Sequence, residues 1–329
     1  MLNFKIKDDR YESINSNSRI HVVLSLIISF MLFTSVCAYS DIYSWKDKDG
    51  RIHFGDKVID GVEQKNVDLK LKKSTWKRYS IEVNDVDNIL TDNERQRIDI
   101  DVNTVYQFYD EKLYLDFYKT VPVKIRLYEK QESYQQYLSG RGYKNTNGTR
   151  GMYFPQSNEI VLYLNKKERW RTFWTIKHET SHAIVDSLTA YTPAWFNEGL
   201  AENMESLGYR DGVFFLSPHI ENKNSINRAR KSGHRLNVES FLSMSSRDYY
   251  ASMKSGHSRY QAYAGELVRM LLTDERGQNI VRRMLHTYKR GSRVYSAQII
   301  EEHYFGGLTA LQIHWDDWVI RNSSKKILL

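Results

Sequence analysis

The feature that most constrains this chain of 329 residues is a pair of histidines four positions apart, His178 and His182. The segment around them, Trp170 to Val185, has aromatic and aliphatic residues at helical spacing, which predicts a single helix. Residues four apart on a helix project from the same side, about one turn from each other. Two neutral imidazoles at that spacing can hold one Zn²⁺, each at about 2.0–2.1 Å. We therefore expect a helix that presents two metal ligands on one face.

A third ligand is expected on a second helix, because a catalytic zinc ion has three protein ligands and keeps its fourth position for water. Downstream of His182, the segment from Pro193 to Glu202 predicts the start of such a helix. Glu198 in this segment is the candidate third ligand. Glu202 lies one turn further along the same face. We expect Glu202 to accept a hydrogen bond from the distal nitrogen of a zinc-bound imidazole, that of His178, and so to fix its tautomer.

Glu179 follows the first histidine and has a role other than that of a ligand. In the pattern H-E-x-x-H, this glutamate can reach a metal-bound water without itself binding the metal. It is therefore the candidate general base, which takes a proton from that water. The alternative interpretation is an amphipathic helix pair whose acidic residues face solvent.

H-E-x-x-H followed by W-F-N-E-G-L-A-E resembles the gluzincin zinc peptidases, and it is particularly similar to a bacterial peptidase-like family with P-x-W-x-x-E-G-x-A-E. The resemblance spans Tyr79 to Val319 and implies a zincin-like domain with one Zn²⁺ on His178, His182 and Glu198. The gap between the two motifs is shorter than in thermolysin or the gluzincin aminopeptidases. No exopeptidase motif of the G-x-M-E-N type precedes His178, which disfavours an aminopeptidase.

A candidate for stabilising the oxyanion comes from the same resemblance. Ser258 to Leu272 resembles the gluzincin helix that carries a tyrosine near its start, and in such enzymes a tyrosine or histidine hydrogen-bonds the tetrahedral oxyanion. The resemblance makes Tyr260 the candidate and Tyr263 the alternative, while packing on a core-facing helix would explain either tyrosine equally well. Other candidate donors are His219, His234 and His257.

The rest of the chain after residue 84 predicts an α+β fold. Thr91 and Glu94 form a capping box that opens a long helix. Its core-facing residues are expected to be Ile98, Ile100, Val102, Val105, Tyr106, Phe108 and Leu113. Val121 to Leu127 alternates as a strand, and Gly151 to Leu164 predicts a strand pair. Beyond Lys167 the patterns are almost wholly helical, so we expect a small mixed sheet followed by a helical subdomain.

The N-terminal residues 1–38 predict a secretory signal peptide. A charged leader precedes the apolar stretch Ile20 to Ala38, and we place the cut after Ala38. Cys37 is the only cysteine, so the mature chain would have neither a disulfide nor a thiolate metal site. Two alternatives remain: an uncleaved anchor, since the 19 apolar residues are long enough to span a bilayer, and a lipoprotein cut before Cys37, which the bulky Val36 disfavours.

The segment Asp41 to Asp56 predicts a β-hairpin, with Asp49 and Gly50 at its turn. It is similar to a small N-terminal domain of unknown function that is common in proteobacterial envelope proteins, with the pattern W-x-D-x-x-G-x-x-H-[FY]-[ST]-D. The matching residues are Trp45, Asp47, Gly50, His53, Phe54 and Asp56. Gly55 departs from the pattern, and a structural role for His53 is favoured over a ligand role.

These patterns divide the chain into four parts. They are a leader or membrane anchor (1–38), a hairpin module (39–61), a polar linker (62–84) and a zincin-like metallopeptidase domain (85–329). The net charge of +8 fits nucleic acid or an anionic envelope surface, and export disfavours nucleic acid.

The sequence predicts a zinc-dependent endopeptidase, periplasmic or secreted, that acts on a protein or peptide and contacts the cell envelope through its hairpin module. The alternatives are an inactive peptidase-like protein that binds an envelope partner, and a purely structural envelope protein. The complete set of His178, Glu179, His182 and Glu198 argues against a dead site.

Overall fold

The computed structural model divides the chain into two compact units, residues 1–75 and 76–329. The residues that it describes are 42–46, 52–55, 64–67, 79–115, 121–144, 146, 148–254, 259–321 and 324–329. The expected leader and its cleavage site lie outside these residues. Within the described part of the chain, no helix is long and apolar enough to cross a membrane.

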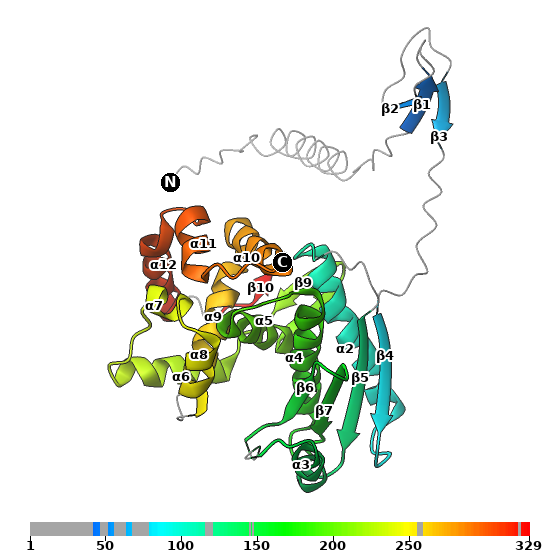
Figure 1. The fold of residues 1–329 in the computed structure, drawn as a ribbon, viewed down its shortest axis with the longest axis vertical. Helices are drawn as coiled ribbons and strands as arrows, with labels where there is room; N and C mark the ends of the chain where they lie inside the picture. The colour runs from blue at the N-terminus through cyan, green and yellow to red at the C-terminus, as the bar shows by residue number, and fades with distance from the viewer. Residues whose placement is uncertain are drawn as a thin grey trace, which may run out of the picture. The chain divides into compact units, whose positions relative to one another are not determined.

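The N-terminal unit contains a three-stranded antiparallel sheet (Figure 1). Its strands β1 (Ile42–Lys46), β2 (Ile52–Gly55) and β3 (Gln64–Val67) have the order β2-β1-β3. The first two strands pair as the expected hairpin, with Trp45 opposite His53. The turn between them is outside the described residues. β3 falls in the segment for which the sequence predicted a linker, so the sheet continues beyond residue 61.

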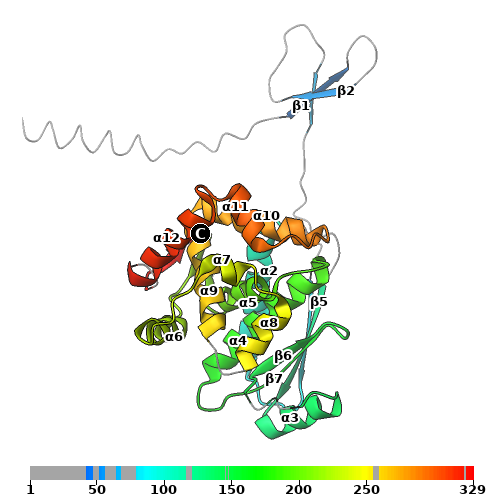
Figure 2. The same ribbon diagram turned by 60° about the vertical axis from the view of Figure 1, so that its left-hand side comes forward.

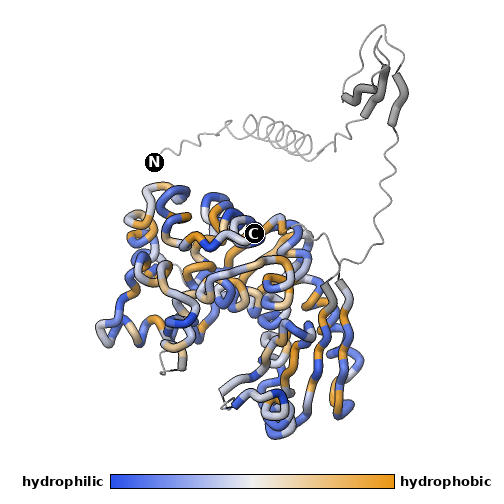
Figure 3. Tube along the Cα trace, in the orientation of Figure 1, coloured by the Kyte–Doolittle hydropathy of each residue, from blue (hydrophilic) through white to orange (hydrophobic). Residues whose placement is uncertain are grey.

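The main unit is built around a four-stranded mixed sheet. Its order is β4-β5-β7-β6, with strands β4 (Tyr79–Asp85), β5 (Val121–Tyr128), β7 (Glu159–Tyr163) and β6 (Gly151–Phe154). The first three are parallel, and β6 is antiparallel to β7 at the edge. Figure 3 shows hydrophobic and hydrophilic residues alternating along β5, which matches the alternation that predicted a strand. The expected α+β class, with a mixed sheet and then a mostly helical region, is confirmed.

Helix α2 (Asp92–Glu111) begins with the expected capping box between Thr91 and Glu94. Its buried residues are Ile98, Val102, Val105, Tyr106, Phe108 and Tyr109. Ile100 was expected in the core, but its side chain is 55% exposed. The reason is the helical period: Ile100 lies about 200° around the axis from Ile98, on the opposite face.

Two helices carry the predicted site, and both lie inside the fold. α4 (Arg169–Leu188) packs against the sheet and α2 on one side and against α5 (Ala194–Glu205) on the other. α5 in turn packs on α9 (Arg259–Leu271). A Cβ atom at Gly199 would lie 2.6 Å from the carbonyl oxygen of Ala264, so glycine is needed for the close approach of α5 to α9.

The other elements pack around the sheet and these helices (Figure 2). They are α3 (Gln131–Gly140), β8 (Leu207–Arg210), β9 (Val213–Leu216), α6 (Ile220–Lys231), α7 (Val238–Leu242), α8 (Ser246–Lys254), α10 (Glu275–Lys289), α11 (Ser296–His303), α12 (Gly307–Arg321) and β10 (Ile327–Leu328). Strands β10, β9 and β8 form a second antiparallel sheet of the main unit. Trp315 and Trp318 of α12 are buried in the core.

Candidate metal centre

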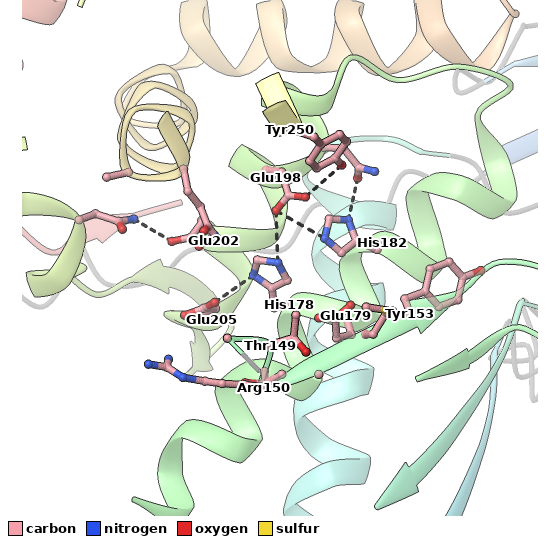
Figure 4. Close-up of a pocket in the computed structure, with 18 of the residues that line it drawn as sticks. Thr149, Arg150, Tyr153, His178, Glu179, His182, Glu198, Glu202, Glu205 and Tyr250 are labelled. Atoms are coloured by element: carbon pink, nitrogen blue, oxygen red, sulfur yellow. Dashed lines mark hydrogen bonds and ion pairs between the residues drawn. The ribbon is translucent and has the colours of Figure 1, made fainter. Parts of the chain in front are cut away.

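The structure brings the three predicted ligands together. His178 and His182 project from α4, with ring centroids 4.9 Å apart. The Oε2 atom of Glu198 on α5 is 3.6 Å from Nε2 of His178 and 3.8 Å from Nε2 of His182. These three ligand atoms all lie within 4.8 Å of one another, so the group could hold a metal ion (Figure 4).

A hydrogen bond to Glu205 orients His178. Its Nδ1 is 2.9 Å from Oε1 of Glu205, and because an ionised carboxylate only accepts, Nδ1 carries the proton. The Nε2 atom is then the one left for a metal ion, and it faces Glu198. The other oxygen of Glu205 accepts from Nε2 of His219 at 3.1 Å. That assignment follows because Nδ1 of His219 accepts from the backbone N–H of Asn222.

His182 is oriented in a similar way by an amide. Its Nδ1 is 3.1 Å from Oδ1 of Asn197, and Nδ2 of Asn197 donates to Asp186 at 3.1 Å. Because the amide nitrogen is engaged by Asp186, the amide oxygen faces the imidazole and accepts its Nδ1 proton. Both histidines therefore point Nε2 at the same place, and acceptors on their far side fix this tautomer.

Glu198 is held as an ionised carboxylate. Burial alone would raise its pKa, but the neighbouring imidazoles of His182 and His178 and a hydrogen bond from Tyr250 outweigh burial and lower the pKa to about 2. The hydroxyl of Tyr250 donates to Oε1 at 3.2 Å, while Oε2 lies toward the histidines. A negative oxygen next to two imidazole nitrogens is a donor set that zinc prefers.

Glu179 lies at the wall of the same pocket, with 8% of its surface exposed. Figure 4 shows it beside the two imidazoles and next to Tyr153 of β6. The backbone N–H of Tyr153 hydrogen-bonds its carboxylate. Burial raises the pKa of Glu179, against the lowering effect of His178 and His182. Glu179 therefore lies next to the predicted ligands and is hydrogen-bonded to the edge strand β6, as a candidate general base requires.

The structure gives Glu202 different partners from the expected one. The oxygen that meets Nδ1 of His178 belongs to Glu205, whereas Glu202 accepts from Asn222 at 2.8 Å and from Gln261 at 2.6 Å. Both carboxylates lie near this face of α5, and the amides of Asn222 and Gln261 engage Glu202. His178, Glu202 and Glu205 also form a group that could hold a metal. Because Glu205 already accepts the Nδ1 proton of His178, we assign it as the hydrogen-bond acceptor of this imidazole and not as a metal ligand.

The tyrosine that meets the ligands is also different from the expected one. The ring of Tyr260 stacks on Phe241 with centroids 6.1 Å apart, and Tyr260 is not among the described residues that line the pocket. The hydroxyl of the alternative, Tyr263, donates to the carbonyl oxygen of His234. Tyr250 of α8 both lines the pocket and reaches Glu198. Of the histidine donors, His219 lines the pocket with its Nε2 engaged by a carboxylate, and His257 lies outside the described residues.

The pocket around these residues is open and has a volume of about 970 Å³. One wall is the edge strand β6 with the loop before it, and the others are α4, α5, α6, α8 and the start of α9. Four site residues were missed by sequence analysis: Asp186, Asn197, Glu205 and Tyr250. A helical period of three and four residues along α5 links Glu198, Glu202 and Glu205 and is a signal that could have found Glu205.

Replacement of Glu205 should weaken zinc binding more than replacement of Glu202. Glu205→Gln removes the charge that accepts the Nδ1 proton of His178, so we expect the zinc dissociation constant to rise by about 10–100-fold. Glu202→Gln is the matched control, because it makes the same replacement one turn away and leaves that hydrogen bond in place. Competition with a fluorescent zinc chelator measures both constants. A larger loss in the Glu202 variant would contradict the assignment.

Comparison with known proteins concerns the N-terminal unit. Residues 29–75 match a family described as a domain of unknown function, DUF4124. This match covers the segment where the sequence resembled an envelope domain, and the metal centre lies outside it. No curated protein matches the chain.

Proposed function

We propose that the chain is a zinc-dependent endopeptidase of the gluzincin type, with a zincin-like catalytic domain. The observation that carries the proposal is the convergence of two Nε2 atoms and one carboxylate oxygen, each imidazole being oriented by an acceptor at Nδ1. This donor set matches the two histidines and one glutamate of known catalytic zinc sites. A bound Zn²⁺ would polarise a substrate carbonyl and lower the pKa of a coordinated water toward 7.

The chain itself would supply the proton transfer. Glu179 adjoins both histidines, and the N–H of Tyr153 holds its carboxylate at the pocket wall. From there it would take a proton from the attacking water and pass it to the leaving amine. Tyr250 would turn its single O–H donor from Glu198 to the oxyanion, because it is the tyrosine that both lines the pocket and approaches a ligand.

The edge strand favours a polypeptide substrate over a small molecule. β6 is at the end of the sheet order and its residues line the pocket. An edge strand presents unpaired N–H and C=O groups, to which an extended peptide can add as a further strand. A peptide bound in this way would run past Glu179, since that residue lines the same pocket as β6.

We further propose that this activity is periplasmic or secreted, with membrane anchoring as the alternative. The support is the charged leader followed by the apolar stretch of residues 20–38, and the absence of cysteine after residue 37. The N-terminal unit, whose family match carries no described chemistry, would then provide contact with the cell envelope.

Metal content and turnover measured together test the proposal. The purified protein should contain one zinc ion per chain and should hydrolyse an unfolded, dye-quenched protein, and a chelator should abolish hydrolysis until zinc is restored. His182→Ala should lose stoichiometric zinc, because one of three ligands is removed. His314→Ala is the matched control, since this exposed histidine bonds Tyr304 and lies outside the pocket.

Two outcomes would contradict the proposal. Full zinc content in His182→Ala would show that the metal, if any, is held elsewhere. Stoichiometric zinc without turnover on any unfolded protein would instead favour the inactive peptidase-like protein that binds a partner.

A further inference from the structure

A second pocket of about 580 Å³ lies on the main unit, away from the metal centre and sharing no residue with it. It is formed by one face of α10 and by the end of α11, which pack against each other (Figure 2). Its lining includes Arg276, Ile280, Arg283, Arg290, His303 and Phe305. We call it the arginine pocket. Its lining contains three arginines and two histidines but no carboxylate.

The three arginines recur every seven residues, so they lie along one face of α10. Arg276 and Arg283 are exposed, as is Arg290 just after the helix. Among the described residues none of the three has a carboxylate within ion-pair distance, whereas Arg282 on the neighbouring face pairs with Glu275 at 2.6 Å. The side chains of the pocket face therefore keep a positive charge that the described part of the fold does not neutralise.

The two histidines of the pocket lie within this positive field. The pKa of His286 is lowered, first by burial and then by repulsion from Lys289 and Arg290. One Nη atom of Arg283 is 3.4 Å from Nε2 of His303. Two carboxylates lie near the lining: Glu302, 3.7 Å from the same His303 nitrogen, and Asp274, whose charge acts on Tyr304. Among the described residues, neither carboxylate forms an ion pair with the three guanidinium groups.

The pocket also has an apolar part. Phe305 at its rim is 82% exposed, with the guanidinium of Arg276 at 6.0 Å from its ring centroid. Ile280 lies below, with 4% of its surface exposed. A ligand that carries both an anionic group and an apolar side chain can place the anionic group on the guanidinium groups and the apolar side chain on the exposed phenylalanine. A simple inorganic anion would use only the charged half of this surface.

The length of the row indicates the shape of the ligand. Arg276 and Arg290 are 14 residues apart in sequence, which corresponds to about 21 Å along a helix that rises about 1.5 Å per residue. An extended peptide advances about 3.3 Å per residue, so about six residues span that distance. We propose that the arginine pocket binds an extended acidic peptide segment of a protein partner, with carboxylates on the arginines and an apolar side chain on Phe305.

Peptide binding measured by fluorescence anisotropy tests this proposal. The probe is a fluorescein-labelled peptide of alternating glutamate and leucine residues, and the protein carries Glu179→Gln so that the probe is not hydrolysed. Combined replacement of Arg276, Arg283 and Arg290 by glutamine should weaken binding by at least about 10-fold, because each exposed guanidinium–carboxylate pair contributes a modest increment. Phe305→Ser should weaken binding of this peptide but not of an all-glutamate peptide.

The matched control replaces Lys124, Lys130 and Lys231 by glutamine, which removes the same charge from exposed positions elsewhere. It should leave the affinity within about two-fold of the parent protein. An equal loss in both triple variants would overturn the proposal, because it would show attraction by net charge alone. Displacement of the peptide by inorganic phosphate, or binding to phosphatidylglycerol vesicles in place of the peptide, would also overturn it. Circular dichroism verifies that each variant is folded.

Discussion

Glu179→Gln should leave zinc bound and reduce kcat by about 10²–10⁴, the range that general acid–base catalysis contributes. The substitution keeps the shape of the side chain and its contact with the backbone N–H of Tyr153. It removes the atom that accepts a proton from the attacking water. The groups in the described structure that could hold a metal do not include Glu179, so metal content should not change. Steady-state kinetics on a quenched peptide, together with zinc analysis of the same sample, measures both effects.

The control for this variant is Glu111→Gln, which makes the same replacement at an exposed residue on α2. It should keep the parent kcat and zinc content. Parent-level proteolysis by Glu179→Gln would disprove the proposed mechanism. Loss of zinc in that variant would instead show that the carboxylate of Glu179 holds the metal, and that the pocket is organised differently from the structure described above.

The parts of the site that depend on one helix could be predicted from the sequence. The four-residue spacing of His178 and His182 places both imidazoles on one face, whatever surrounds the helix. The capping box at Thr91 and the alternation along β5 are equally local, and both appear in the structure. The error at Ile100 was also local, since the helical period separates it from Ile98 and could have excluded it from the core.

The partners of the ligands could not be predicted, because they depend on how helices cross. Glu202 and Glu205 are three residues apart on α5, so the sequence alone cannot decide which of them meets His178. Only the packing of α6 and α9 shows that the amides of Asn222 and Gln261 donate to Glu202. The hydrogen bond that His178 donates to Glu205 is then a consequence of tertiary structure.

The third strand of the N-terminal unit was missed for a related reason. Its residues Gln64–Val67 have no alternation of apolar and polar side chains, which is the signal that predicts a strand. The strand is defined by pairing with β1, in the register of Ile42 opposite Val67. Pairing of this kind between segments distant in sequence is not encoded in the local pattern.

The choice among 23 tyrosines is where the structure changes the proposed mechanism most, and it leads to a prediction that separates two residues. Tyr250→Phe should lower kcat by about 10²–10³, because loss of one hydrogen-bond donor to an oxyanion costs about 3–4 kcal/mol of transition-state stabilisation. KM should change little, since the oxyanion exists only in the transition state and the tetrahedral intermediate. Tyr260→Phe should keep the parent kcat, because its ring packs on Phe241 and the substitution preserves that ring.

Tyr250 also donates to Glu198, so its removal has a second effect that must be measured separately. Loss of that hydrogen bond should raise the zinc dissociation constant by about 10-fold at most, as for other partners of a ligand. Kinetics at saturating zinc isolates the oxyanion effect, since the metal site is then full in both proteins. If the kcat of Tyr250→Phe returns to the parent value when zinc is saturating, the tyrosine acts only by positioning Glu198. If Tyr260→Phe shows the larger loss, the oxyanion donor is the tyrosine of α9, and α9 must move toward the pocket when substrate binds.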